Sequence, residues 1–291
     1  MGLLQETCDA IHSRSKEIEQ HIIKNWNDAS DIKQYGRLVN MVAQYGAATN
    51  QENVTIPKPC MIIASADHGV ADMGVSAYPK ETTVGMTQNY LIPKGAGANS
   101  LANYCGATME VIDMGIDADM SWVPGLRSHK LGMGTKNFVE EPAMTREQAI
   151  EGIETGIKLV QEKMADGYNV FLVGEMGISN TTASALMTAK FAGLTAEEAT
   201  GRGTNISDER LKLKQRIVHD VLVKYKDIPK DDAIGILAAV GGFEFTCIVG
   251  VILGAAAHHG MVIIDGFNTS ACALVAKTLV PASMDYVMAS H

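Results

Sequence analysis

The sequence predicts an α/β protein built on a doubly wound parallel sheet with a small N-terminal helical subdomain. Short, continuous apolar runs are typical of strands that are buried on both faces of a parallel sheet. Helical stretches separate these runs, and each run is followed by polar or glycine-rich residues. The 291 residues fit one large domain with an appendage. Ligands of such sheets bind at the carboxyl ends of the strands, so we expect the functional residues there.

The N-terminal part, residues 1–50, is expected to form a helical subdomain or an arm that packs on a partner. Residues 3–26 read as one helix, and Asp31–Gln44 as a second. The first helix is predicted from apolar residues at helical spacing: Leu4, Cys8, Ile11, Ile18 and Ile22.

The remaining residues, 51–291, are expected to form the doubly wound domain. Its predicted strands are residues 59–66, 108–114, 169–173 and 260–265. Its predicted helices include residues 83–104, residues 145–165 and a segment that begins near Thr182.

Composition and charge exclude several classes of protein. The net charge is −9 and no lysine- or arginine-rich run is present, which argues against a nucleic-acid partner. The longest apolar stretches, residues 245–257 and 259–264, are interrupted by Gly250, Gly254 and His258, which argues against a membrane span. The amphipathic, acidic N-terminus does not have the pattern of a signal peptide or of a myristoylation site.

The five cysteines are widely spaced and form no CxxC pair. Apolar neighbours around Cys105, Cys247 and Cys272 favour reduced, buried thiols, and therefore a cytoplasmic protein without structural metal.

The run from Gly174 to Thr182 (GEMGISNTT) carries the strongest chemical signal. Its glycines let the backbone approach a ligand, and its Ser, Asn and Thr residues open a helix. Free N–H groups and hydroxyls at a helix N-terminus suit a phosphate or a carboxylate. The alternative is that Asn180 and Thr181 only cap the helix. The run is not a Walker A loop, because no Gly-Lys-Ser/Thr follows.

A second glycine-rich turn, residues 201–208 (GRGTNISD), is followed by Lys212 and Lys214. Backbone amides with a reaching lysine are a candidate cradle for the same phosphate. The alternative is a solvated turn with exposed lysines.

Several acids and one histidine lie at other predicted strand ends. Asp67 and His68 have no third ligand at metal-binding spacing, so we expect Asp67 to hold His68 in place at a strand end rather than a metal site. Asp113 and Asp117 are strand-end acids of open purpose. Glu244 is expected in the first turn of a helix, where the helix dipole favours an acid, although a catalytic role is equally open.

Taken in order, these segments resemble the nicotinate-nucleotide:dimethylbenzimidazole phosphoribosyltransferase family, from about residue 35 to the last residue. The resemblance rests on ADHGV (66–70), GVSAYPK (74–80), GTKN (134–137), PAMT (142–145), GEMGISNTT (174–182), GRGTN (201–205), GGFE (241–244), DGF (265–267) and SH (290–291).

The resemblance implies a doubly wound fold, a dimer, and a reaction that needs no metal or cofactor. The implied substrates are nicotinate mononucleotide and the aromatic base that becomes the lower ligand of a cobamide. The base displaces nicotinate from C1′ and gives an α-riboside 5′-phosphate. A general base must take the proton of the incoming nucleophile, and phosphate-binding groups must hold the reactants in line.

Site residues carry over by position in these motifs. Glu175 matches a glutamate that assists the catalytic base, and is the catalytic candidate here. The substrate-binding candidates are Gly177, Ser179, Asn180 and Thr181 near the mononucleotide, Gly203, Thr204, Asn205 and Lys214 at the phosphate, and Ser290 near the end of the chain. Tyr78 and Met86 match positions that line the pocket of the aromatic base. They are larger and less polar than the residues of some benzimidazole users, so the base, benzimidazole or phenolic, stays open.

In the family, the Ser290-His291 motif continues into a segment that carries the principal catalytic glutamate, whereas this sequence ends at His291. Two expectations follow from the resemblance. Either the chain represents part of a longer transferase, or it is a non-catalytic subunit beside a longer homologue, as in a two-subunit relative that activates phenol and p-cresol. The expected assembly is accordingly a homodimer or a heterodimer.

A dinucleotide-binding dehydrogenase is a poor alternative. Its glycine-rich turn follows the first strand, whereas Gly95 and Gly97 follow a helical stretch.

Overall fold

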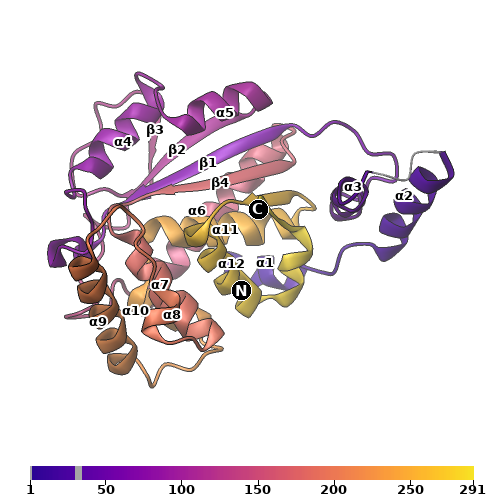
Figure 1. The fold of residues 1–291 in the computed structure, drawn as a ribbon. Helices are drawn as coiled ribbons and strands as arrows, with labels where there is room; N and C mark the ends of the chain where they lie inside the picture. The colour runs from indigo at the N-terminus through magenta and orange to yellow at the C-terminus, as the bar shows by residue number, and fades with distance from the viewer. Residues whose placement is uncertain (1, 30–34) are drawn as a thin grey trace.

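The computed structural model describes residues 2–29 and 35–291 and is organised around a six-stranded, all-parallel sheet. The strands lie in the order β3-β2-β1-β4-β5-β6, and Figure 1 labels the first four of them. Their bounds are β1 Pro59–Ala66, β2 Thr108–Gly115, β3 Leu126–Ser128, β4 Val170–Met176, β5 Met261–Ile264 and β6 Val287–Ala289. The order reverses between β1 and β4, which is the topological switch point of a doubly wound sheet. The predicted fold class is confirmed.

The register of the central strands aligns their carboxyl ends. Ala64 of β1 pairs with Glu175 of β4, and Ser65 pairs with both Asp113 of β2 and Met176 of β4. The polar residues that follow these strands therefore meet at one edge of the sheet.

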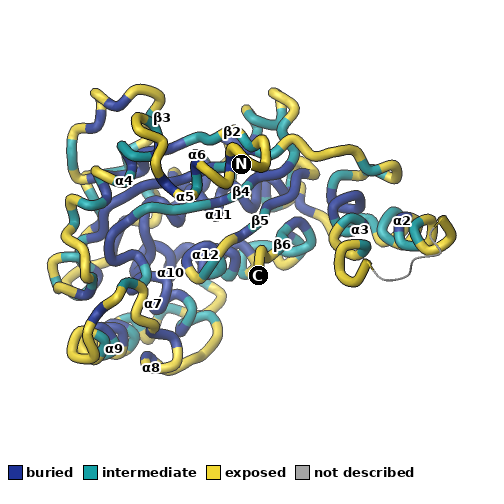
Figure 2. The backbone as a smooth tube through the Cα atoms, turned by 45° about the horizontal axis from the view of Figure 1, so that its top comes forward, coloured by how far each residue is buried: buried dark blue, intermediate teal, exposed yellow. Residues whose placement is uncertain are grey.

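Helices cover the two faces of the sheet unequally. In Figure 1, α4 (Thr82–Leu91) and α5 (Gly97–Cys105) lie over β1–β3 on one face, and α6 (Arg146–Ala165), α11 (Phe243–Ala257) and α12 (Phe267–Leu279) lie on the other. The remaining helices of the domain are α7 (Asn180–Ala192), α8 (Ala196–Ala199), α9 (Asp208–Lys224) and α10 (Ala233–Val240), with the 3-10 turns η1 (Gly69–Met73) and η2 (Pro281–Tyr286). Figure 2 shows buried backbone along α11, in which residues 243–256 are all buried.

Helix α11 forms the centre of the apolar layer. The apolar run at 245–257 is a buried helix because glycine lets it lie directly on α6: a Cβ at Gly250 would stand 2.0 Å from the carbonyl oxygen of Ile153, and one at Gly156 would stand 2.1 Å from that of Cys247. Within the described residues, no helix combines the length and hydrophobicity that a membrane crossing requires.

Two predicted helices are each broken in two. Residues 3–26 form α1 (Leu3–Ala10) and α2 (Lys16–Ala29), because Ser15 begins a new helix: its Oγ accepts from the N–H of Ile18, 3.2 Å away. Residues 83–104 divide into α4 and α5 at Pro93, which has no N–H to donate, and Lys94, whose φ is +53°.

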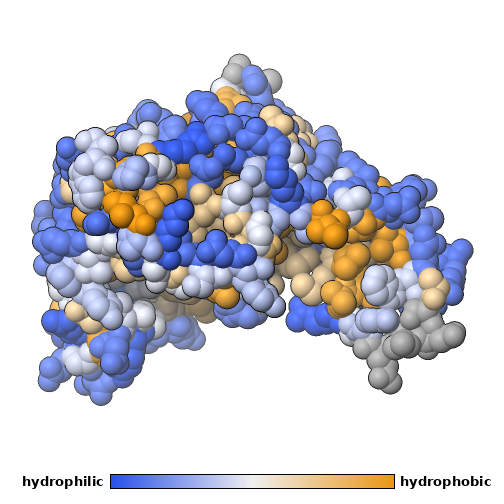
Figure 3. Space-filling model, turned by 90° about the horizontal axis from the view of Figure 1, so that it is seen from above, coloured by the Kyte–Doolittle hydropathy of each residue, from blue (hydrophilic) through white to orange (hydrophobic). Residues whose placement is uncertain are grey.

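The N-terminal helices divide between two neighbourhoods. Helix α1 packs on α6 and α11 of the main body, whereas α2 packs on α3 (Leu38–Ala48). The predicted second helix, Asp31–Gln44, begins later than expected, and residues 31–34 lie outside the described part of the chain. Figure 3 shows a hydrophobic patch where α2 and α3 lie, and Leu38 and Met41 of α3 are exposed. The boundary near residue 50 stays a prediction.

The cysteines are free in the described residues. Burial raises the pKa of the Cys247 thiol to about 12, and it raises that of Cys272 well above the ordinary value, as expected for inert thiols. The expectation is wrong for Cys105, which lies exposed at the C-terminal end of α5, on a stretch where Leu101 and Tyr104 are exposed as well.

Candidate active site

Glu175 lies within strand β4 and not in the loop that follows it, because β4 continues through Met176. Gly177 then turns the chain so closely under β1 that a Cβ there would stand 2.5 Å from the carbonyl oxygen of Ala66. Ser179 completes the turn with φ +76° and precedes the first residue of α7. The run from Gly174 to Thr182 therefore comprises the end of a strand, a tight turn and a helix N-terminus, and the predicted helix start near its Ser, Asn and Thr residues agrees with the structure.

Two carboxamides hold the carboxylate of Glu175. Asn268 Nδ2 donates to Glu175 Oε1 at 2.9 Å, and Asn180 Nδ2 donates to Oε2. Asn268 Nδ2 also lies 3.0 Å from Asn180 Oδ1. Burial raises the pKa of Glu175, and the two amide donors oppose this rise without cancelling it. A fixed carboxylate whose pKa is shifted toward neutrality suits a general base.

Asn268 is a site residue that the sequence analysis missed. It lies in the first turn of α12, three residues after Asp265, the acid that follows strand β5. That position, at the carboxyl end of a parallel strand, was the available signal.

Lys214 joins the second glycine-rich turn to the first. Its side chain is 1% exposed, and its Nζ donates to Thr181 Oγ1 at 2.7 Å and to the carbonyl oxygen of Gly201 at 3.3 Å. Burial lowers its pKa to about 8, and no carboxylate in the described chain pairs with it. Gly203 has φ +72°, and a Cβ there would stand 2.6 Å from Thr181 Oγ1. The alternative of a solvated turn applies to Lys212, which is exposed, and not to Lys214.

A cavity of about 970 Å³ opens beside these residues. One part of its wall is polar, with Glu175, Thr181, Gly203, Asp265, Asn268 and Ser290. Another part is apolar, with Met61, Ile63, Tyr90, Leu172, Ile263 and Phe267. Its volume and mixed lining suit a ligand of moderate size with one charged and one aromatic part.

The structure brings only some of the predicted residues to this wall. Ser290 lines the cavity, and its N–H donates to the carbonyl oxygen of Ile264 at 3.0 Å. Tyr78 is 57% exposed on a loop that Thr204 holds through the N–H of Ala77, at 3.0 Å. Met86 packs against the cluster that contains Ile63 and Tyr90 and does not itself line the cavity. Asn205 is exposed in its turn.

His68 has a different partner from the one expected. Its Nε2 lies 2.6 Å from Glu244 Oε1, and both side chains are fully buried. Asp67 instead accepts from the N–H of Asp117 at 2.8 Å, because the chain turns after β2 and brings that amide to it. No cluster of three or more potential metal ligands occurs among the described residues.

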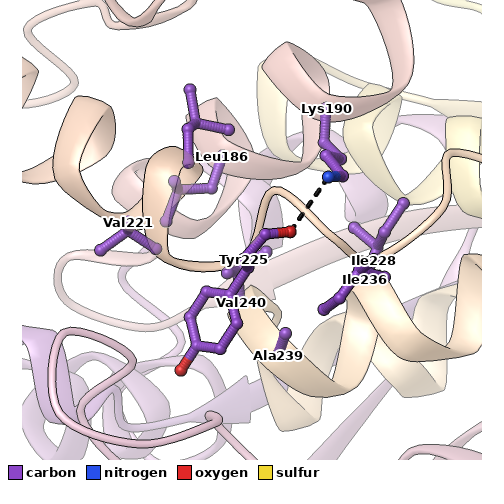
Figure 4. A pocket seen from close by; sticks show the side chains of 9 residues that line it. Leu186, Lys190, Val221, Tyr225, Ile228, Ile236, Ala239 and Val240 are labelled. Atoms are coloured by element: carbon purple, nitrogen blue, oxygen red, sulfur yellow. Dashed lines mark hydrogen bonds between the residues drawn. The ribbon is translucent and has the colours of Figure 1, made fainter.

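Another cavity, of about 10 Å³, is too small and too apolar to be a binding site (Figure 4). Apolar side chains of α7, α9 and α10 line it, and Lys190 at its edge donates to the carbonyl oxygens of Tyr225 and Lys226, both at 3.0 Å. This space holds at most a water molecule and belongs to helix packing.

The fold and the site together define a doubly wound α/β enzyme whose polar residues gather at the switch point of the sheet. The chain belongs to the phosphoribosyltransferase family whose model matches residues 11–291.

Relatives and solved structures agree with this assignment. The chain is 43% identical over 256 residues to the nicotinate-nucleotide–dimethylbenzimidazole phosphoribosyltransferase of Chloroflexus aggregans, which covers 88% of this chain and 72% of that protein. Its identity to the enzyme of the same name from Geobacter metallireducens is 43% over 265 residues, or 91% and 74% of the two chains. The crystal structure of the enzyme from Thermus thermophilus superposes with a TM-score of 0.87 at 30% identity, covering 95% of this chain and 82% of that one.

Proposed function

We propose that this chain transfers the 5-phosphoribosyl group of nicotinate mononucleotide to a cobamide lower-ligand base and releases nicotinate. The observation that carries the proposal is the buried ammonium of Lys214. It has no carboxylate partner in the described chain, and it joins two glycine-rich turns beside the cavity that Glu175 lines. A buried cation of this kind is stabilised when an anion binds next to it.

The phosphate is proposed to bind where α7 begins. The N–H groups at a helix N-terminus attract anions, and Lys214, Thr181 and the turn 203–205 lie beside this end. Ser179 supports the assignment, because its buried hydroxyl has no partner in the described chain and its backbone takes a left-handed conformation.

Glu175 is proposed as the general base. A ring nitrogen of the incoming base attacks C1′ of the ribose, and the bond from C1′ to the nicotinate nitrogen breaks with its electron pair on nicotinate. The N–H proton of the incoming base passes to the Glu175 carboxylate. Asn180 and Asn268 hold that carboxylate in place through the transfer.

The apolar wall is proposed to hold the aromatic ring. Met61, Ile63 and Tyr90 present a surface that suits a benzimidazole, and benzimidazole is the acceptor in the names of the relatives. Met86 supports this wall from behind. Phenol or p-cresol would attack through a hydroxyl oxygen, so acceptor specificity separates the two classes of base.

The test is release of nicotinate from nicotinate mononucleotide by the purified chain, with dimethylbenzimidazole and with p-cresol as acceptors. We expect turnover with dimethylbenzimidazole and a fall in kcat of about 100-fold or more in Glu175→Gln. Lys190→Met serves as a control away from the site, since Lys190 is not among the residues that line the cavity.

Other outcomes separate the alternatives. Turnover with p-cresol but not with dimethylbenzimidazole would show that the acceptor is a phenolic base. Binding of the mononucleotide with turnover only after a longer homologue is added would make this chain the partner subunit of a heterodimer, in place of a homodimer that is active by itself. No binding at millimolar mononucleotide would overturn the proposal.

A further inference from the structure

A fully buried acid–base pair lies directly behind the turn that carries Glu175. The 2.6 Å contact between His68 Nε2 and Glu244 Oε1 joins the end of β1 to the first turn of α11. A Cβ at Gly177 would stand 3.2 Å from His68 Cδ2 and 3.3 Å from Glu244 Oε1. On the other side, a Cβ at Gly242 would stand 2.5 Å from His68 Cε1. The pair is enclosed between two glycines, and one of them is two residues from Glu175.

We propose that His68 and Glu244 form a positioning pair for Glu175: the imidazolium of His68 balances the Glu244 charge and so lets Glu175 ionise beside it. The inference rests on the proposed function, in which Glu175 is the general base.

The charges near Glu175 support this role. Burial by itself lowers the pKa of His68, but the neighbouring carboxylates, Glu244 first and then Asp67 and Glu175, more than reverse this, so the pKa of His68 is raised and its imidazolium form is favoured. Glu244 acts to raise the pKa of Glu175, whereas His68 acts to lower it. The two influences oppose each other only while both members are present.

The other ionisable groups around the pair are acids or weak acids. Asp67 at the end of β1 and Glu175 of β4 act on His68, Cys272 of α12 lies near Glu244 and Glu175, and Tyr90 of α4 lies near Glu175. Asp67 is anchored by the N–H of Asp117. Among these described groups His68 is the cation, so its removal leaves an excess of negative charge next to Glu175.

The hydrogen bonding of the pair is incomplete for a purely structural contact. His68 Nδ1 and Glu244 Oε2 are buried and have no partner in the described chain. Buried polar atoms in stable cores are nearly always paired, so unpaired ones at a site indicate a functional constraint.

The test compares pH profiles of kcat/KM for the single variant His68→Gln and the double variant His68→Gln/Glu244→Gln. The single variant leaves the Glu244 charge unbalanced, which raises the pKa of Glu175. We therefore expect the acid limb of the profile, where kcat/KM rises as Glu175 ionises, to move up by about one pH unit or more. The double variant removes both charges and returns the limb to within a few tenths of a unit of the wild type. A role in packing alone predicts a double variant at least as impaired as the single one, with an unmoved limb.

Failure of the inference and failure of the proposed function give different results. If the acid limb persists in Glu175→Gln, Glu175 is not the base. If Glu175→Gln abolishes the limb but His68→Gln does not move it, the positioning role is overturned.

A measurement on the wild type keeps the inference testable if His68→Gln does not fold. Nitrogen-15 spectra of the chain, which has eight histidines, are expected to show a buried imidazolium that keeps its proton above pH 7. Glu244→Gln identifies this signal by making it neutral. If every buried histidine is neutral at pH 7, the pair cannot balance charge and the inference fails.

Discussion

Two lysines lie at opposite ends of helix α7: Lys190 is in its last turn, and Lys214 of α9 contacts its first turn. The two lysines differ in what surrounds them. Lys190 is half-buried and donates to the carbonyl oxygens of Tyr225 and Lys226, just past the end of α9. Figure 4 shows the first of these two hydrogen bonds. A cation at the C-terminal end of a helix meets the negative end of the helix dipole.

Lys214 lies in the opposite situation. It is buried against the start of α7, where the helix dipole is positive, and it donates to one hydroxyl and one more distant carbonyl oxygen. A lysine that the fold satisfies is a structural cap. A lysine that the fold buries without an anion is typical of a binding site, because its environment is completed by the ligand.

The largest expected effect comes from removing each lysine in turn. We expect Lys214→Met to weaken binding of nicotinate mononucleotide by roughly 100-fold, because losing one member of a buried charge pair costs about 2–5 kcal/mol. Lys190→Met should leave binding unchanged and lower the free energy of unfolding by about 1 kcal/mol, since it removes a helix cap. Calorimetric titration and thermal unfolding of both variants measure the two effects.

Stability is the control for this pair of variants. Removing an unpaired buried ammonium relieves desolvation, so Lys214→Met should be no less stable than the wild type at pH 7. Equal losses of affinity in the two variants would mean that the lysines do not differ in role.

Two glycines at the same two ends of α7 sharpen the comparison. Gly193 ends the helix at φ +72°, and Gly203 has the same φ beside its beginning. Alanine in this conformation costs about 1–2 kcal/mol of stability at either position. Gly203→Ala should in addition weaken mononucleotide binding about tenfold, because the new methyl group displaces Thr181 at an expected cost of about 1.4 kcal/mol.

Gly193→Ala serves as the matched control, since the nearest atom to its new Cβ is the flexible end of Lys230, at 2.8 Å. If Gly203→Ala destabilised the protein without changing the dissociation constant, the turn at 203 would be structural and the phosphate would have to bind elsewhere.

The sequence predicted well those features that depend on local pattern. Apolar runs gave the central strands, and glycine with Ser, Thr and Asn gave both turns of the site, because these residues determine backbone conformation within a few positions. The helix breaks at Ser15 and Pro93 carried local signals as well, and were missed because apolar residues occur on both sides of each break.

The partners of the polar residues could not be predicted in the same way. Glu244 lies 176 positions from His68, and Asn268 lies 93 positions from Glu175. Lys212 and Lys214 are equally basic in sequence, and only the packing of α9 against α7 buries the second. Contacts of this kind depend on how the elements pack, which no single segment encodes.

The smallest expected effect is the pH dependence that separates Lys214 from an ordinary lysine. Its pKa is lowered by burial from 10.5 to about 8, so in the free protein the ammonium is present below pH 8 and is lost as the pH rises through that value. Affinity for nicotinate mononucleotide should therefore fall above pH 8, by at most about tenfold per pH unit, and Lys214→Met should bind with a flat profile.

Stability should respond to pH with the opposite sign. Between pH 8 and 10.5 the unfolded chain holds the lysine proton that the folded chain has released, so this residue makes the free energy of unfolding rise with pH across that window. Titration calorimetry and chemical denaturation at matched pH values measure both trends. Affinity and stability that fell together above pH 8 would indicate general unfolding, whereas opposite trends that vanish in Lys214→Met would identify the buried ammonium as their common cause.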